Sequence, residues 1–236
     1  GNILPQIELE VPPHVMQHYE ELLASDAYPP CHKIIPGLSR LTVTSWLSAL
    51  QTERLEQKTK AIAQRAEACD GSWEAAFFVT LARNYGFGIN GDAFEQWAMC
   101  LPLQAVAHHR DNLFQVEAMF LGQAGLLNLD AISACHRDEV LADVYFSKLQ
   151  HEYLYLKHKF GLNPIDHHLW RFLRLRPQNF PHIRIVQLAR LYATGQISLS
   201  HVLDCQTVKE AMKCLKSCVT LYWQTHYSFG VASEVS

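Results

Sequence analysis

The densest group of chemically active side chains in this 236-residue sequence lies in the stretch RFLRLRPQNFPHIR, residues 171–184. Five arginines stand against a single aspartate between residues 166 and 190. Arginine forks bind phosphate oxygens in pairs, and an aromatic ring such as Trp170 or Phe180 can stack on a base. The stretch therefore predicts a phosphate or nucleic-acid site. Its candidate residues are Arg171, Arg174, Arg176, Asn179 and Arg184.

The same stretch also fits a purely structural role. Pro177 and Pro181 fix two bends, and proline suits the first position of a helix. Asn179 is then expected to cap that helix, whose N-terminus would also offer donors to a phosphate. In the structural interpretation, the arginines bind loop carbonyls or pair with carboxylates elsewhere in the chain. Those carboxylates are Glu95, Asp111 and Glu117.

A second polar group lies in HHRDNLFQVEAMFLGQAG, residues 108–125. Its members are His109, Arg110, Asp111, Glu117 and Gln123. Glu117 and Gln123 stand among apolar residues, where an unpaired carboxylate is costly to bury. An arginine is the natural partner, so the group predicts either an internal ion pair or the polar pocket of an enzyme.

Two short motifs resemble catalytic signatures but lack the context that those signatures need. GFGING, residues 86–91, has the glycine spacing of a dinucleotide-binding loop, yet a helical pattern precedes it instead of a strand. We interpret it as a glycine-rich turn between helices. The triplet His109-Arg110-Asp111 matches a kinase catalytic loop, but Val116 occupies the position where a kinase needs asparagine.

No metal site or cofactor is predicted. His14 and His18, like Cys214 and Cys218, have helical spacing, but two ligands do not fix a zinc ion. The adjacent His167 and His168 would point apart on a helix.

Composition limits the classes of protein that fit. The chain is 49% hydrophobic and 18% charged, with a formal net charge of −3, which is typical of a globular protein without a general affinity for nucleic acid or acidic membranes. Seven scattered cysteines favour a reducing compartment, and no apolar run is long enough to cross a bilayer. The opening GNILPQIELEVPPH lacks the pattern of a secretion signal. We therefore expect a cytoplasmic protein without a membrane partner.

The apolar periodicity predicts a mainly α, multi-helix globular fold of bundle-like type. Residues 1–36 form a proline-rich entry with one short helix, and residues 37–236 form a single helical domain, a fragment of a longer protein. Ser72 and Asn112 are expected to cap the helices that follow them, and Asp92 to cap a helix that ends at Cys100. Residues 138–160 are expected to form one long amphipathic helix ended by Gly161. Residues 170–176 are ambiguous between strand and loop. The other expected helices span 15–24, 42–68, 73–84, 102–109, 113–127, 183–192 and 207–216.

Four segments together resemble one protein family. They are SWEAAFFVTLARNYGFGINGDAFEQWAMCLPL (72–103), HRDNLFQVEAMFLGQAGLL (109–127), RFLRLRPQNFPHIRIVQLARL (171–191) and YWQTHYSFG (222–230). They are similar to the bacterial domain-of-unknown-function family 2851, from about residue 8 to the C-terminus. The resemblance implies no established activity. It implies longer full-length members, with an upstream β-rich half of restriction-endonuclease-like type, whose motifs do not occur in this chain.

Three hypotheses about function follow. The first is a helical accessory module of a nuclease-like protein, which binds nucleic acid or another phosphate ligand through residues 171–184 and has the upstream domain as its partner. The second is an enzyme whose pocket contains His109, Arg110, Asp111 and Glu117. The third is an oligomerisation or protein-interaction domain that uses the apolar face of 138–160 and the aromatic C-terminal tail. The sequence leaves the oligomeric state open.

Overall fold

Helices make up most of the chain, which confirms the predicted mainly α, multi-helix fold. The computed structural model describes residues 10–24 and 35–232. The chain divides into two units, residues 1–58 and 59–236. The domain boundary predicted near residue 36 stays a prediction, and much of the proline-rich entry lies outside the described residues.

Unit 1 contains the expected short helix, α1 (Pro13–Leu23), a 3₁₀ turn (Ile35–Gly37) and most of α2 (Arg40–Ala68). The long helix α2 continues into unit 2. Its predicted extent is confirmed, but apolar side chains on it remain exposed, such as Trp46 at 63% and Leu47 at 50%. Periodicity therefore identified the helix without showing what its apolar side chains contact.

Unit 2 begins with four helices that the sequence anticipated: α3 (Trp73–Tyr85), α4 (Gly91–Met99), α5 (Leu103–Ala107) and α6 (Leu113–Gln123). Ser72 caps α3 by accepting a hydrogen bond from Ala75 N at 3.2 Å, and Asn112 caps α6 in the same way. The predicted cap of α4 by Asp92 is wrong. Asn90 occupies the cap position, and its side chain bonds another segment.

The single helix expected over residues 138–160 is in fact two helices, α7 (Arg137–Ala142) and α8 (Val144–Phe160). Asp143 separates them because its backbone is extended and its carboxylate caps α8, accepting from Tyr145 N at 2.8 Å. Gly161 ends α8 in the left-handed conformation at φ +62°, as predicted.

Residues 170–176 form no strand; they are irregular, with a turn at residues 173–174. A 3₁₀ turn (Pro177–Asn179) follows, and Pro181 opens α9 (Pro181–Ala193). The predicted capping of α9 by Asn179 is wrong, because Phe180 occupies the cap position and the Asn179 amide accepts from Arg184 instead.

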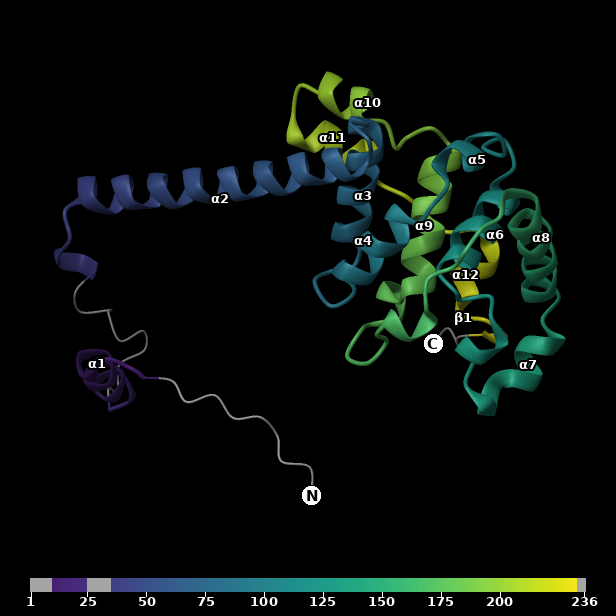
Figure 1. The fold of residues 1–236 in the computed structure, drawn as a ribbon, viewed down its shortest axis with the longest axis horizontal. Helices are drawn as coiled ribbons and strands as arrows, with labels where there is room; N and C mark the ends of the chain where they lie inside the picture. The colour runs from purple at the N-terminus through teal and green to yellow at the C-terminus, as the bar shows by residue number, and fades with distance from the viewer. Residues whose placement is uncertain (1–9, 25–34, 233–236) are drawn as a thin grey trace. The chain divides into compact units, whose positions relative to one another are not determined.

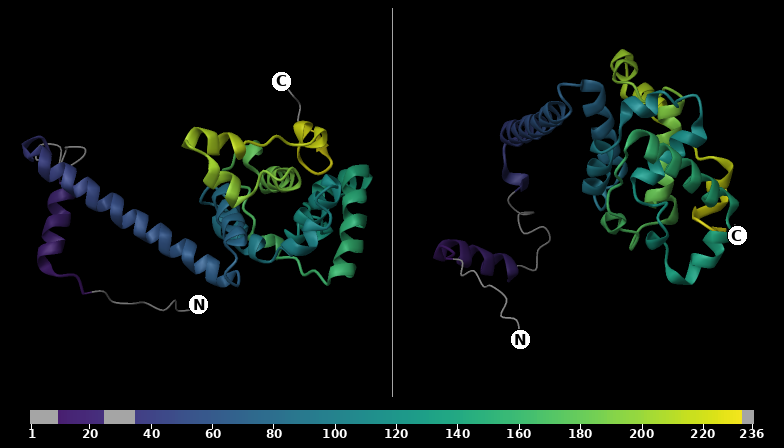
Figure 2. Two further views of the ribbon diagram at one scale, coloured as in Figure 1. Left: turned by 90° about the horizontal axis from the view of Figure 1, so that it is seen from above. Right: turned by 45° about the vertical axis from the view of Figure 1, so that its right-hand side comes forward.

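Helix α9 runs through the middle of unit 2, with α3 and α4 on one side and α6 and α8 on the other (Figures 1 and 2). Its central position follows from its sequence, since apolar side chains are buried along most of its length. The core around it is aromatic. Trp97 donates to Phe120 O at 3.0 Å and Trp170 donates to Ala124 O at 2.7 Å, so both indole N–H groups are satisfied.

The chain continues through α10 (Leu199–Asp204), α11 (Val208–Cys214) and α12 (Leu221–Thr225), and α11 confirms the helix expected near 207–216. An antiparallel pair, β1 (His226–Ser228) and β2 (Val231–Ala232), follows with His226 opposite Ala232. Further 3₁₀ turns span Leu129–Ala131, Ala134–His136 and His167–Leu169. No helix among the described residues is both long and apolar enough to cross a membrane.

The close approach of α6 and α8 depends on Gly122. A Cβ atom built there would lie 2.1 Å from the ring of Tyr153 on α8. We expect Gly122→Ala to lower the free energy of unfolding by about 2 kcal/mol, because the overlap outweighs the helix propensity that alanine adds. Urea denaturation measures the change. Gly91→Ala is the matched control, since its Cβ would meet its nearest neighbour at an ordinary 3.5 Å. Equal stability of the two variants would contradict the packing argument.

Candidate functional site

Three of the predicted ligand residues are exposed on one short segment, residues 171–176, which we call the arginine loop. Arg171, Arg174 and Arg176 are all exposed, and no side-chain hydrogen bond or ion pair holds their guanidinium groups among the described residues. Leu173 at the turn is 81% exposed. The loop thus presents three free positive charges to solvent.

The backbone of the arginine loop is nevertheless firmly placed. The buried amide of Asn90 donates to Arg171 O and accepts from Arg171 N, both at 2.8 Å. Phe172 packs edge-on against Phe180, with ring centroids 5.4 Å apart. Arg174 lies at φ +66°, a conformation that is uncommon for a residue with a side chain. Such a position persists only where the surroundings determine it, which is a property expected of a binding loop.

Arg184 and Asn179 belong to a different, half-buried arrangement. Arg184 donates through Nη1 to Gln187 Oε1 at 2.9 Å and through Nη2 to Asn179 Oδ1. Its guanidinium lies 4.4 Å from the ring centroid of Phe87. Burial lowers the pKa of Arg184 because no carboxylate compensates for the lost hydration. The five predicted residues therefore separate into three free arginines and one internal pair.

Phe87 belongs to the GFGING turn, which joins α3 to α4 as interpreted from the sequence. A Cβ on Gly86 would approach Asn90 C at 2.5 Å, so the turn needs glycine for close backbone packing. Its role is to hold Phe87 against Arg184 and Asn90 against the arginine loop.

None of the three carboxylates expected to neutralise the arginines does so. Glu95 pairs with Arg65 and Arg83 instead. Asp111 is exposed and forms no ion pair within the described residues. Glu117 is only 2% exposed and lies in a separate pocket.

The Glu117 pocket is a hollow of about 580 Å³. It is lined by Leu113, Phe114, Glu117, Tyr145, Arg190, Thr220, Leu221 and Tyr222. The Tyr145 hydroxyl donates to Glu117 Oε2, while Oε1 is buried without a hydrogen-bond partner among the described residues. Burial raises the pKa of Glu117 to about 7, and Tyr145, Thr220 and Arg190 oppose that rise. A carboxyl group of this kind can exchange a proton near neutral pH.

The second predicted group does not converge on one pocket. His109 bonds Gln115 at 2.7 Å and packs against Phe160, and Gln123 bonds Cys100 O and the Tyr153 hydroxyl inside the core. Neither His109 nor Asp111 lines the Glu117 pocket. The enzyme pocket that was to combine these residues with Glu117 is therefore not formed.

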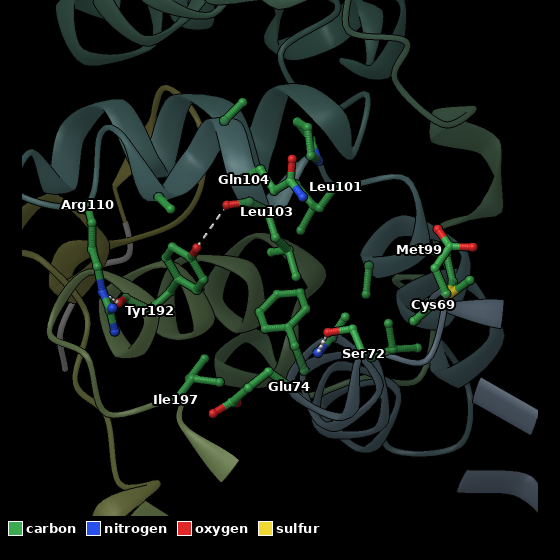
Figure 3. A pocket seen from close by; sticks show the side chains of 18 of the residues that line it. Cys69, Ser72, Glu74, Met99, Leu101, Leu103, Gln104, Arg110, Tyr192 and Ile197 are labelled. Carbon is green, nitrogen blue, oxygen red and sulfur yellow. Dashed lines mark hydrogen bonds between the residues drawn. The ribbon is translucent and has the colours of Figure 1, made fainter. Parts of the chain in front are cut away.

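Arg110 lines another pocket, of about 970 Å³, between α3, α5 and the end of α9. Figure 3 shows the Arg110 side chain beside Tyr192, at the opposite end of the pocket from Cys69 and Met99. Arg110 Nε donates to Tyr192 O at 2.8 Å. Glu74, in the same pocket, accepts from Leu199 N at 2.9 Å and so holds the start of α10.

The prediction that His167 and His168 point apart is wrong, because they lie in a 3₁₀ turn and their ring centroids are 4.0 Å apart. With Asp166 they place three possible ligand atoms within 4.8 Å of one another. His168 N and His168 Nδ1 both bond Asp166 Oδ1, and these hydrogen bonds lower the pKa of Asp166. The carboxylate thus has a structural role as cap of the turn.

The residues that position the arginine loop and the Glu117 pocket were not identified from the sequence. Asn90 gave no signal beyond its place in a glycine-rich turn, and Tyr145 read as one apolar position among many. Arg190 and Thr220 approach Glu117 from α9 and from the segment before α12. Only the tertiary structure brings these separate segments together.

Comparison with known proteins adds a family but no activity. A family model described as "Protein of unknown function (DUF2851)" matches residues 1–236. Comparison with curated proteins gives no match. Comparison with solved structures gives none either.

The buried carboxyl group of Glu117 predicts a pH dependence of stability. Its pKa is about 7 in the folded chain against an ordinary value of 4.5, so the folded state holds a proton that the unfolded state releases between those values. The free energy of unfolding should therefore fall as pH rises from 5 to 8, by up to about 3 kcal/mol relative to Glu117→Gln. Urea denaturation of both proteins at several pH values measures this difference.

Comparison with the Glu117→Gln variant is needed because His182 changes the free energy of unfolding with pH in the opposite direction. Burial lowers the pKa of His182 to about 4, so its contribution is lost as pH falls below its ordinary value of 6.5. That effect is present in both proteins and cancels in the difference. A difference that does not change with pH would show that Glu117 keeps an ordinary pKa.

Proposed function

The chain belongs to the DUF2851 family, and we propose that it is a helical module that binds the phosphate backbone of nucleic acid through the arginine loop. The observation that carries the proposal is the exposure of Arg171, Arg174 and Arg176 on one fixed loop, without partners among the described residues. A guanidinium group binds phosphate oxygens through paired hydrogen bonds, and none of these three has another partner among the described residues to give up.

The alternative hypothesis is that the same arginines stabilise the fold instead of binding a ligand. It requires them to bind carbonyl groups or carboxylates of the fold, as Arg110 binds Tyr192 O and Arg83 binds Glu95. None of the three loop arginines has such a contact in the described part of the chain. Their charges are therefore not needed to hold the loop, which Asn90 and Phe172 position through the backbone and through packing.

Binding through this loop should depend little on base sequence. Trp170, expected to stack on a base, is only 5% exposed and bonds Ala124 O. The N-terminus of α9 is closed as well, since Pro181, His182 and Ile183 are buried. Contacts are thus limited to phosphates, which position a strand but do not identify its bases.

A sequence-independent phosphate contact suits an accessory role. The chain carries a net charge of −3, so attraction to nucleic acid is local and modest. An upstream nuclease-like domain of the same protein, which the family resemblance implies, would supply chemistry while the arginine loop holds the strand. This assignment of roles is part of the proposal.

Fluorescence anisotropy with a labelled 20-base-pair duplex tests the proposal at about 50 mM salt, where phosphate contacts are strong. Three phosphate contacts predict that the logarithm of the association constant falls against the logarithm of salt concentration with a slope of about −3. The triple variant R171Q/R174Q/R176Q should lose most of the affinity.

The matched control is K148Q/K209Q/K213Q, which removes three exposed positive charges from other helices. It should retain affinity if the loop is the site. Absence of binding by the native chain at about 50 mM salt, or equal losses in the two triple variants, would overturn the proposal.

Asn90 provides a second test because it places the loop without touching a phosphate. Asn90→Ala leaves the Arg171 N–H and carbonyl without their partner, and should cost about 1 to 3 kcal/mol of stability. At a temperature where the variant remains folded by circular dichroism, we expect weaker duplex binding with an unchanged salt slope. Unchanged affinity would show that the loop does not need its observed backbone position.

A further inference from the structure

The turn at residues 166–168 brings three possible metal ligands together. His168 Nδ1 lies 2.8 Å from Asp166 Oδ1, and His167 Nδ1 lies 3.7 Å from the same oxygen. One possible ligand atom from each residue lies within 4.8 Å of the other two. Among the described residues, no other group of three histidine, cysteine, aspartate or glutamate side chains meets this condition.

These spacings suit a single metal ion. Zinc bonds imidazole nitrogen and carboxylate oxygen at about 2.0 to 2.2 Å, so two ligand atoms of a tetrahedral zinc ion lie about 3.4 Å apart. The observed distances of 2.8 Å and 3.7 Å lie on either side of that value. The side chains of Asp166 and His168 are 65% and 78% exposed, so both can rotate to equalise the distances.

The backbone of the turn is fixed against the end of α6. Before the turn, Ile165 N donates to Gln123 O at 2.9 Å, and after it the indole N–H of the buried Trp170 donates to Ala124 O at 2.7 Å. The approach is close, because a Cβ atom on Gly125 would lie 2.6 Å from Ile165 O. Ligands on a backbone that is already placed lose little conformational freedom on binding, which favours affinity.

His167 has no hydrogen-bond partner in the described part of the chain. Its side chain is only 16% exposed, and Asp166 Oδ1, at 3.7 Å from Nδ1, is too distant for a hydrogen bond. Its ring nitrogens are nevertheless not among the buried polar atoms that solvent cannot reach. An imidazole that is mostly covered, unpaired and still accessible is available to coordinate a metal ion.

The three side chains together favour one kind of ion. Two imidazoles and a carboxylate suit zinc and other late divalent transition metals, whereas magnesium and calcium prefer oxygen ligands. Asp166 forms no ion pair with a lysine or an arginine within the described residues, so its charge can act on a cation. It can also keep the hydrogen bond from His168 N while it binds a metal, because a carboxylate has two acceptor oxygens.

We propose that Asp166, His167 and His168 bind one zinc ion through a carboxylate oxygen and one nitrogen of each imidazole. Coordination replaces the hydrogen bond between His168 Nδ1 and Asp166. Three protein ligands leave a further position on the ion for water or another ligand, whereas structural zinc sites use four protein ligands. None of the three residues belongs to the arginine loop, so this inference goes beyond the proposed function and does not rest on it.

Isothermal titration calorimetry with zinc chloride tests the proposal. Cysteines and other histidines of the chain can also take up zinc, so the native chain is compared with variants that change only this turn. His168→Gln removes a ligand from an exposed side chain, and Asp166→Asn removes the charge but keeps a residue type that caps. Each variant should lose one bound zinc ion or bind it at least about tenfold more weakly, since even outer-shell substitutions at metal sites cost that much.

The matched control is His151→Gln/His201→Gln, which removes two exposed histidines from α8 and α10. It should keep the zinc ion that the turn variants lose. Magnesium chloride in the same titration should give no binding that depends on His168. Circular dichroism verifies that each variant is folded, and the high exposure of His168 makes its substitution the least disruptive.

Long-range ¹H–¹⁵N NMR spectra of the imidazole rings identify the ligands directly. Zinc should shift ring-nitrogen signals of both His167 and His168, which are assigned by their loss in His167→Gln and His168→Gln.

Three results would overturn the proposal. The first is no binding of zinc by the native chain. The second is an equal number of zinc ions, bound with equal affinity, in the native chain, His168→Gln and Asp166→Asn. The third is a loss in the His151/His201 control as large as the loss in His168→Gln.

Discussion

The structure of unit 2 depends on the burial of α6 from its second turn onward. Every residue from Val116 to Gln123 is buried, and α8 and α9 both pack against this helix. A helix enclosed in this way must satisfy its polar side chains internally, because water does not reach them. Gln123 meets this demand fully, through Cys100 O and the Tyr153 hydroxyl. Glu117, almost two turns earlier, meets it at only one of its two oxygens.

The same constraint explains the packing of neighbouring helices. The absence of a side chain at Gly122 lets the ring of Tyr153 approach α6, and this approach places the Tyr153 hydroxyl beside Gln123. The aromatic tail closes the opposite side, where Trp223 is buried and Tyr222 stacks on Tyr145. Phe146, Leu149, Tyr153 and Leu156 of α8 are thus buried inside the fold with Trp223 of the tail, whereas Val144 on α8 and Leu221 in the tail stay exposed, at 65% and 81%. Other exposed apolar side chains lie on α2.

Charged groups of this protein differ in how much of their hydration they keep. The arginines of the loop remain hydrated and carry their charge at little cost, so they need no internal partner. Glu117 has lost its hydration, so burial raises its pKa and its charge depends on what stands beside it. Arg184 is intermediate, since the ring of Phe87 and two side-chain amides replace part of its water. Arginines that look alike in the sequence therefore differ in hydration and in the partners that they bind.

The sequence predicted helix ends correctly where the residues that determine them lie within a few positions of one another. The serine and asparagine caps of α3 and α6, the glycine end of α8 and the proline at the start of α9 were all anticipated, because capping and proline geometry depend on near neighbours. The predictions were wrong where a side chain made a contact that the apolar pattern does not indicate. Asn179 bonds Arg184 instead of capping α9, and Asn90 takes the α4 cap position expected for Asp92 and binds the arginine loop. Asp143 divides the helix expected over 138–160 because it caps α8.

The sequence by itself determined that this chain is mainly helical, that it belongs with one family, and which residues carry its unusual chemistry. The tertiary structure decided which of those residues act together. It left Arg171, Arg174 and Arg176 exposed and Arg184 half-buried, and it separated Glu117 from His109 and Arg110 to join it with Tyr145, Arg190 and Thr220. The physical reason is that the pairing of charges depends on distance and hydration in space, and these are set by the packing of helices that lie far apart in the chain.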